Sequence, residues 1–289
     1  MSPFSSGGKP GEEFVFPQIC AFFQDRVTNR KEMQMEDLTF FDVNCQIGTP
    51  MCGCLEFASK TEDLIKELDF AGISKAVVSH VNTPSGGAVL GNHFVNRALR
   101  EDTEQRLIGC WCILPECLNE NIPSGENLCR EMKEKRIGML EICPVSHRWV
   151  PHRITIGKLF DMLAEHKILI KTSVQEMGSW NEFYNLVERF PRNRFLITNT
   201  NLWGCDRYIR PLFETTDKVF MELSEYWVAE GIANLVERYG ADHLLYGSGY
   251  PSWTHVSQMM NIKHAKISES DRRKIASGNL ERLLEEAQL

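Results

Sequence analysis

Short apolar segments alternate with longer amphipathic segments from residue 38 to residue 289. The apolar segments have the length and composition of buried strands, and the longer ones carry apolar residues at helical spacing. Such alternation is typical of βα units around a parallel sheet. Eight strands are expected, at Leu38–Asn44, Lys75–His80, Leu107–Leu114, Ile137–Cys143, Ile168–Ser173, Arg194–Asn199, Lys218–Leu223 and His243–Gly247.

The segments between these strands predict helices. Polar and apolar positions separate onto two helical faces, and a Ser/Thr cap marks the start of the first segment, Thr61–Ala71. The expected helices are Thr61–Ala71, Gly91–Glu101, Ile156–His166, Ser179–Phe190, Trp227–Tyr239 and Ser270–Glu286.

Eight βα units in a chain of 289 residues predict an α/β fold, a single-domain (β/α)8 TIM barrel. An open doubly wound sheet is disfavoured because no G-x-G-x-x-G sequence follows the first strand. In a barrel the chemistry lies at the carboxyl ends of the strands and in the loops that follow them. Polar residues at those positions are therefore the candidates for function.

The first 37 residues predict an N-terminal extension, with residues 38–289 forming the barrel. Residues 1–13 are rich in Ser, Gly and Pro, which is typical of a partly flexible segment. Residues 14–23 are apolar but too short to span a bilayer. We expect this segment either to plug one end of the barrel or to contact a second subunit. The second alternative would make the protein a homo-oligomer.

The composition excludes several classes of function. A net charge of −7 and a pI near 5.7 argue against a nucleic-acid partner. No apolar run is long enough to cross a membrane and no signal peptide is evident, so a cytoplasmic protein with a small-molecule substrate is expected. The 10 cysteines suit reduced thiols in a chain of this length better than a disulfide framework.

Four segments together resemble the amidohydrolase superfamily, in its amidohydrolase-related branch of TIM-barrel metal-dependent hydrolases. The segment Phe40-Phe-Asp-Val-Asn-Cys-Gln-Ile-Gly48 resembles the first strand, which ends in Asp-x-His-x-His. Residues 240–251, Gly-Ala-Asp-His-Leu-Leu-Tyr-Gly-Ser-Gly-Tyr-Pro, resemble the eighth-strand signature nearly residue for residue. Residues 191–199 and 277–284 resemble the sixth strand and the terminal helix.

The resemblance implies a metal site whose ligands have been replaced. The family's metal-binding residues align with positions that here carry amides, a lysine or threonine, and a glycine: Asn44, Gln46, Lys171 or Thr172, Asn199 and Gly249. Carboxamides are weak ligands for zinc beside imidazole, and glycine can neither bind a metal nor accept a proton from water. We therefore expect no metal and no other cofactor.

A metal site rebuilt from other residues is the alternative. His80 ends the second strand, and Cys143, His147 and His152 follow the fourth strand. The neighbouring arginines, Arg148 and Arg153, make that loop a poor place for a further cation.

Four residues are candidates for catalysis. His80 titrates near neutrality and ends a strand, although a core histidine is an equal alternative. Lys171 could bind an anion, act as a base or form a Schiff base, or it could form a salt bridge with Glu141 or Glu222. Glu141 and Glu222 lie among apolar residues, where burial would raise the pKa of a carboxyl group, unless strand alternation turns them outward.

Further residues at the barrel mouth are candidates for binding the substrate. Asn44, Gln46 and Asn199 offer amide donors and acceptors to a carbonyl or carboxylate group. The predicted lining of the barrel mouth also includes His147, in the loop after the fourth strand, and the aromatic residues Tyr226 and Tyr250.

Three functions follow from these residues. The first is metal-independent hydrolysis of a lactone or amide, or decarboxylation, of a small carboxylated substrate. The second is a catalytically silent barrel that binds a small ligand or a protein. The third is a metal-dependent hydrolase with relocated ligands. A serine-nucleophile enzyme is disfavoured because residues 247–249 lack the G-x-S-x-G elbow.

Overall fold

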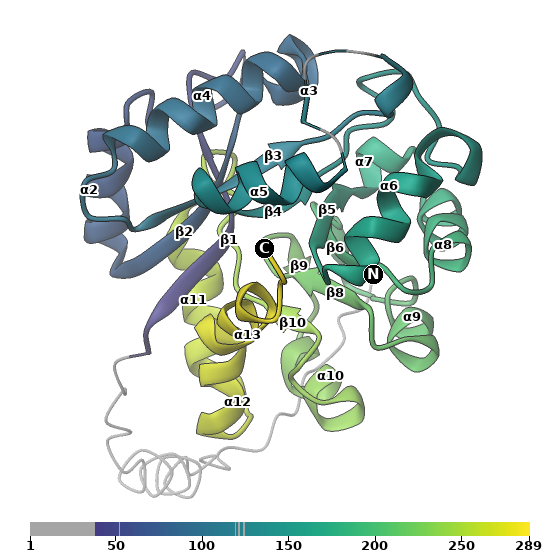
Figure 1. Ribbon diagram of the computed structural model, residues 1–289. Helices are drawn as coiled ribbons and strands as arrows, with labels where there is room; N and C mark the ends of the chain where they lie inside the picture. The colour runs from purple at the N-terminus through teal and green to yellow at the C-terminus, as the bar shows by residue number, and fades with distance from the viewer. Residues whose placement is uncertain (1–37, 52, 119, 121, 124) are drawn as a thin grey trace, which may run out of the picture. The chain divides into compact units, whose positions relative to one another are not determined.

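The computed structural model describes residues 38–289 except 52, 119, 121 and 124 (Figure 1). The predicted N-terminal extension, residues 1–37, lies outside the described residues, so its expected place at a barrel end or a subunit contact stays a prediction.

Eight parallel strands form the central sheet in the order β1-β2-β3-β4-β5-β6-β8-β10. A parallel bridge between Cys45 and Tyr250, and a hydrogen bond of 3.1 Å from Val43 N to Tyr246 O, join the last strand to the first. The predicted (β/α)8 barrel is confirmed. The strands are β1 Phe40–Ile47, β2 Ile73–His80, β3 Leu107–Cys112, β4 Ile137–Glu141, β5 Leu169–Ser173, β6 Arg194–Thr198, β8 Val219–Glu222 and β10 Leu244–Leu245.

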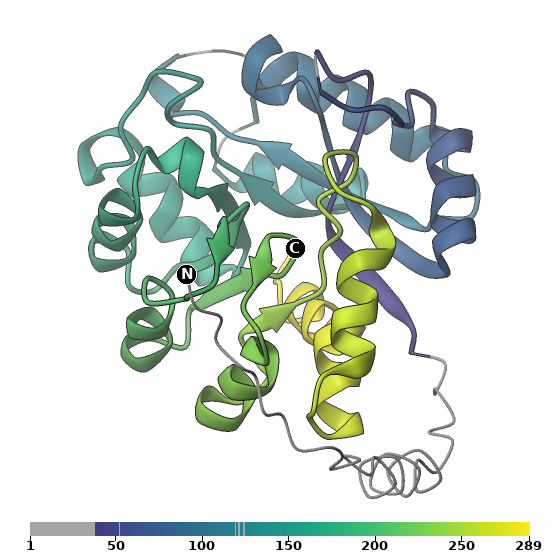
Figure 2. The ribbon, with the colours of Figure 1, turned by 180° about the vertical axis from the view of Figure 1, so that it is seen from behind.

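Helices surround this sheet on its outer side (Figures 1 and 2). They are α2 Thr61–Ala71, α3 Thr83–Gly86, α4 Ala88–Glu101, α5 Glu126–Glu134, α6 Arg153–Glu165, α7 Val174–Met177, α8 Trp180–Arg189, α9 Arg210–Thr215, α10 Gly231–Tyr239, α11 His255–His264, α12 Glu269–Arg273 and α13 Asn279–Glu285.

Two predicted helices differ from the observed ones. The helix expected from Trp227 begins only at Gly231, because β9 (Tyr226–Trp227) pairs with β7 (Leu202–Trp203) in a small second sheet. The expected helix Ser270–Glu286 is interrupted by a π-helical segment, Lys274–Gly278, between α12 and α13.

The barrel interior begins with an apolar layer near the amino ends of the strands. Because successive side chains of a strand point to opposite faces, each strand contributes alternate residues to the interior. The buried residues of this layer are Phe41, Val43, Val77, Cys110, Met139, Leu169, Leu196, Phe220 and Leu245.

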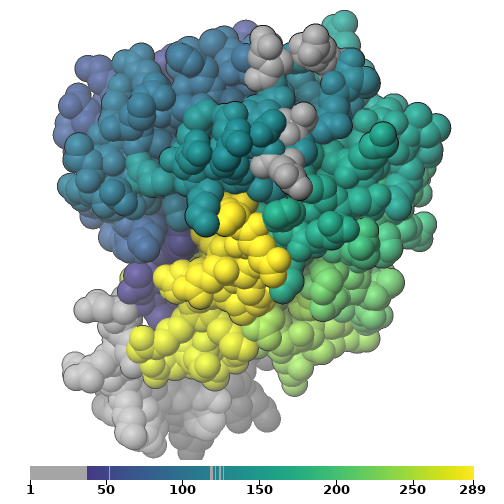
Figure 3. Space-filling view, in the orientation of Figure 1, coloured from purple at the N-terminus to yellow at the C-terminus, as the bar shows by residue number. Residues whose placement is uncertain are grey.

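Helix α13 covers the amino end of the barrel. Its Leu280 and Leu283 belong to the same buried cluster as the inner apolar layer. The space-filling view shows the C-terminal helices α12 and α13, in yellow, in the middle of one face of the barrel (Figure 3). This leaves the carboxyl ends of the strands for the functional site.

Candidate functional site

A layer of polar residues lies above the apolar layer, toward the carboxyl ends of the strands. Since side chains alternate, the residue two positions after each apolar residue faces the same interior. These residues are Ser79, Cys112, Glu141, Lys171, Thr198 and Glu222, all of them buried. Buried polar groups at this end of a barrel are typical of an active site.

Lys171 and Glu141 form an ion pair inside the barrel. Lys171 Nζ lies 3.0 Å from Glu141 Oε2 and donates a hydrogen bond of 3.2 Å to Ser79 Oγ. Burial lowers the pKa of Lys171, but the Glu141 carboxylate outweighs burial and raises it above the ordinary value. Lys171 is therefore a permanent cation. An ammonium group has three N–H donors, and these two partners leave one donor for a substrate oxygen.

Glu222 is the second buried acidic group of the polar layer. Its side chain is 0% exposed, and its Oε2 accepts a hydrogen bond of 3.2 Å from Asn44 Nδ2. The backbone N–H of Ser224 donates to Oε1. Burial raises the pKa of Glu222 to about 7, although the bonds from Ser224 oppose the shift. The carboxyl group can therefore donate or accept a proton near neutral pH.

The absence of a side chain at Gly247 makes room for Glu222. A Cβ atom at Gly247 would lie 2.3 Å from Glu222 Cγ, which is far closer than van der Waals contact. Gly247 therefore leaves the space in which the buried carboxyl group of Glu222 lies.

Asp42 and His255 form a polar contact that sequence reasoning missed. Asp42 Oδ1 accepts hydrogen bonds of 2.9 Å from the backbone N–H groups of Asn44 and Ser248. His255 Nδ1 lies 3.5 Å from Asp42 Oδ2, and His255 is stacked on Tyr250 with ring centroids 4.5 Å apart. His255 is the first residue of α11, and Figure 2 shows this helix beside β1. No motif in the sequence connects the two residues, which are far apart along the chain.

Neighbouring side chains fill the space beside Gly249, where the amidohydrolase resemblance places an aspartate. Gly249 has a φ of +69°, and a Cβ atom there would lie 2.9 Å from Ser224 Cβ and from Trp253 Cδ1. An aspartate would need both a strained backbone and displaced neighbours.

Asn199 binds a neighbouring loop. Its Nδ2 donates to Glu225 Oε1 at 3.3 Å, and the same oxygen accepts a bond of 3.2 Å from Trp253 Nε1. The backbone N–H of Asn201 donates to Glu225 Oε2 at 2.9 Å. Glu225, which was not predicted, thus joins the loops that follow β6, β8 and β10. Its nearness in sequence to Glu222 was the only available signal.

His80 lies apart from Lys171 and Glu222. Because Ser79 faces the interior, the next side chain points toward the helices, where His80 is stacked on Phe94 of α4 at 4.5 Å. Burial lowers the pKa of His80. The structure does not bring this residue together with the other three catalytic candidates.

His147 contacts β3 rather than the acidic groups. Its Nδ1 lies 3.8 Å from Cys112 Sγ, and its Nε2 lies 3.0 Å from Thr83 O. Burial raises the pKa of Cys112 well above its ordinary value, so this thiol is a poor nucleophile. His152, from the alternative metal site, caps α6 by accepting a bond of 3.2 Å from Ile154 N.

Across the described part of the chain, no group of three or more His, Cys, Asp and Glu side chains is arranged to hold a metal ion. The same residues contain no helix that is long and apolar enough to cross a membrane.

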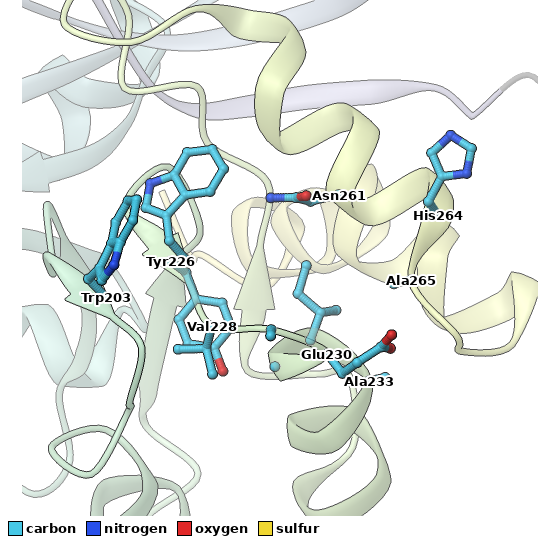
Figure 4. Close-up of a pocket in the computed structure, with 12 residues that line it drawn as sticks. Trp203, Tyr226, Val228, Glu230, Ala233, Asn261, His264 and Ala265 are labelled. Atoms are coloured by element: carbon cyan, nitrogen blue, oxygen red, sulfur yellow. The ribbon is translucent and has the colours of Figure 1, made fainter. Parts of the chain in front are cut away.

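The aromatic candidates occupy two different places. Tyr226 donates from its hydroxyl to Asp206 Oδ2 at 2.7 Å and lines a cavity of about 410 Å³. Figure 4 shows Trp203 and Tyr226 on one side of this cavity and Asn261 of α11 on the other. Tyr250 is buried against His255.

Gln46 is half-buried on β1 beside Ser79. Its side chain forms no hydrogen bond with any residue that the structure describes. Within the predicted site, the structure thus brings together Asn44 with Glu222, and Lys171 with Glu141.

Solved structures with the same fold include several enzymes. The chain is similar to an uncharacterized TIM-barrel protein from Bordetella bronchiseptica, with 16% identity, a TM-score of 0.60, and coverage of 87% of this chain and 100% of the other. A 2,6-dihydroxybenzoate decarboxylase from Rhizobium gives 12% identity, a TM-score of 0.66, and coverage of 86% and 99%.

A probable 2-pyrone-4,6-dicarboxylic acid hydrolase from Acinetobacter baumannii gives 12% identity, a TM-score of 0.60, and coverage of 86% and 100%. No family model and no curated protein sequence matches the chain. At these identities the comparisons establish the fold alone.

Proposed function

We propose that this protein is a metal-independent enzyme of the amidohydrolase superfamily. It acts on a small carboxylated substrate, either by hydrolysis of a lactone or amide or by decarboxylation. The observation that carries the proposal is Glu222, a fully buried carboxyl group in the polar layer whose pKa is raised to about 7. An unpaired carboxyl group costs stability when it is buried, and such groups cluster at sites where protons move.

The residues at the inherited ligand positions do not fit the family's divalent cation. Asn44 is bonded to Glu222, Asn199 is bonded to Glu225, and the space beside Gly249 is filled by Ser224 and Trp253. These positions support a reaction that depends on proton transfer and a fixed cation instead.

In hydrolysis, the Glu222 carboxylate takes a proton from water as the water oxygen bonds to the substrate carbonyl carbon. The remaining N–H of Lys171 donates to the carbonyl oxygen as negative charge develops on it. The bond from this carbon to the leaving oxygen or nitrogen then breaks, and the protonated Glu222 returns its proton to the leaving group. One water molecule is consumed.

In decarboxylation, protonated Glu222 donates its proton to the carbon that bears the carboxylate. The bond between that carbon and the carboxylate breaks, carbon dioxide leaves, and Glu222 regains a proton from solvent. The names of two structural neighbours, a decarboxylase and a probable hydrolase of a pyrone dicarboxylic acid, support both reactions by analogy.

The test is a screen of lactones, amides and aromatic carboxylates with purified protein in the presence of a chelator. We expect turnover that the chelator leaves unchanged and that Glu222→Gln reduces by about a hundredfold or more. Glu214→Gln, which alters an exposed carboxylate bonded to Arg238, is the matched control.

Two results would contradict the proposal. Turnover that stops with chelator and returns with zinc or manganese would show a metal enzyme. A folded protein without turnover on the whole library would favour the silent barrel.

A further inference from the structure

A second cavity lies outside the polar layer, between helices α2 and α11. Its volume is about 480 Å³. The loop after β1, the C-terminal part of α2 and the segment from Tyr250 to Val256 form its walls. The residues that line it include Leu55, Glu56, Glu67, Phe70, Trp253 and His255.

The walls of this cavity are unusually apolar for an exposed surface. Phe70 is 86% exposed and Leu55 is 100% exposed, and Trp253 stands at the same cavity. Large apolar side chains that gather on a surface mark a place where a ligand or partner binds.

The charged residues that line the cavity are both acidic. Glu67 is half-buried on α2 and Glu56 is exposed on the loop. Neither forms an ion pair with a residue that the structure describes. The carboxylates lie near Tyr250, whose pKa is raised by burial first and then by the nearby Glu67.

The N-terminus of α11 also lies at this cavity and carries about half a positive charge. Two carboxylates outweigh that partial charge. The cavity therefore favours a cation over an anion. The barrel interior differs, because Lys171 can donate a hydrogen bond to a substrate oxygen there.

His255 provides a partly unpartnered polar group in the cavity wall. It is 4% exposed, its Nδ1 lies 3.5 Å from Asp42 Oδ2, and its Nε2 has no hydrogen-bond partner among the described residues. Buried polar atoms are nearly always paired, so an unpaired imidazole nitrogen beside a cavity points to a ligand. The N–H of an ammonium group could donate to such a ring nitrogen.

We propose that this cavity binds an organic cation, an ammonium group attached to an aromatic or aliphatic apolar body. The apolar body packs against Phe70, Leu55 and Trp253, and the ammonium group is held by Glu67 and Glu56. Aromatic rings also attract cations through their faces, which adds to the preference.

The test uses three ligands of similar shape with the full-length protein. Phenethylammonium is the cation, phenethyl alcohol is the neutral analogue and phenylacetate is the anion. We expect calorimetry to give saturable binding of phenethylammonium, with the alcohol about tenfold weaker and phenylacetate weaker still.

Variants locate the binding. Glu67→Gln and Phe70→Ala should each weaken phenethylammonium binding by about three- to tenfold. Glu62→Gln is the matched control, because Glu62 lies on the same helix outside the cavity and faces Lys60 at 3.8 Å. Circular dichroism would show that each variant is folded.

Absence of saturable binding to folded protein would overturn the proposal. Equal affinity for the cation and the anion, or Glu67→Gln binding as tightly as the unaltered protein, would also overturn it.

Discussion

Asn44 donates a hydrogen bond of 3.2 Å from Nδ2 to Oε2 of Glu222, from the first strand of the barrel to β8. Asn44 stands where the amidohydrolase resemblance places a metal-binding histidine. An amide that contacts a buried carboxyl group can serve either protonation state, because it offers both a donor and an acceptor. Asn44 thus supports a titrating group.

Glu222→Gln should change how stability depends on pH. The folded pKa of about 7 is above the ordinary 4.5, so the folded state holds the proton over this window. The free energy of unfolding therefore falls as pH rises from about 4.5 to about 7, by up to roughly 3 kcal/mol. The glutamine variant lacks this term, so it should exceed the unaltered protein in stability at pH 8 and match it near pH 4.5.

Urea unfolding at both pH values would measure this difference, with Glu214→Gln, a substitution at an exposed carboxylate, as the control. If Glu222→Gln is destabilised equally at pH 4.5 and pH 8, the buried carboxyl group does not titrate in this window.

The arrangement of the barrel was predictable from the sequence because its strands are buried and apolar. Each expected strand appears in the sheet. The predicted helix boundaries were wrong where tertiary contacts decide them. Tyr226 and Trp227 pair with Leu202 and Trp203 instead of starting a helix. Helix α11 was missed because its sequence, HVSQMMNIKH, mixes polar and apolar residues without a clear helical stripe.

Lys171→Met should destabilise the protein by about 3–5 kcal/mol. The substitution leaves the Glu141 carboxylate buried without its partner, and an uncompensated buried charge is costly. The double variant Lys171→Met/Glu141→Met should recover most of this loss, because apolar residues can replace a buried ion pair at little cost. Urea unfolding of the three proteins measures the effect.

The double variant also separates structure from catalysis. A folded double variant without turnover supports a contact between the substrate and this pair, Lys171 and Glu141. Full activity in that protein would reduce the ion pair to a structural role.

The candidate site was only partly predictable, for a reason of strand geometry. Alternation within a strand places Glu141, Lys171 and Glu222 in the interior, as their apolar neighbours two positions earlier indicate. The same rule turns His80 outward, since Ser79 faces Lys171. A position at the end of a strand does not by itself place a side chain in the site. The side chain must also belong to the alternate set that faces the barrel interior.

Gly249→Asp should not create a metal site. The backbone there has a φ of +69°, and the new Cβ atom would meet Ser224 and Trp253 at 2.9 Å. We expect a loss of about 1–3 kcal/mol in unfolding free energy and no gain in bound zinc. Gly249→Ala should lose stability similarly, because the strain comes from the Cβ atom. Stable folding together with stoichiometric zinc in the aspartate variant would refute this account.

Tyr226→Phe should lower stability and leave substrate binding unchanged. The hydroxyl donates to Asp206 Oδ2 at 2.7 Å, and Asp206 also accepts bonds of 2.6 and 2.8 Å from Arg210. Removing a hydrogen bond to a charged group costs about 1.5–3 kcal/mol. Tyr208→Phe is a suitable control, since Tyr208 is largely exposed. Thermal unfolding and kcat/KM would be measured for both variants. An increase in KM without a loss of stability would instead assign Tyr226 to the substrate, as the sequence suggested.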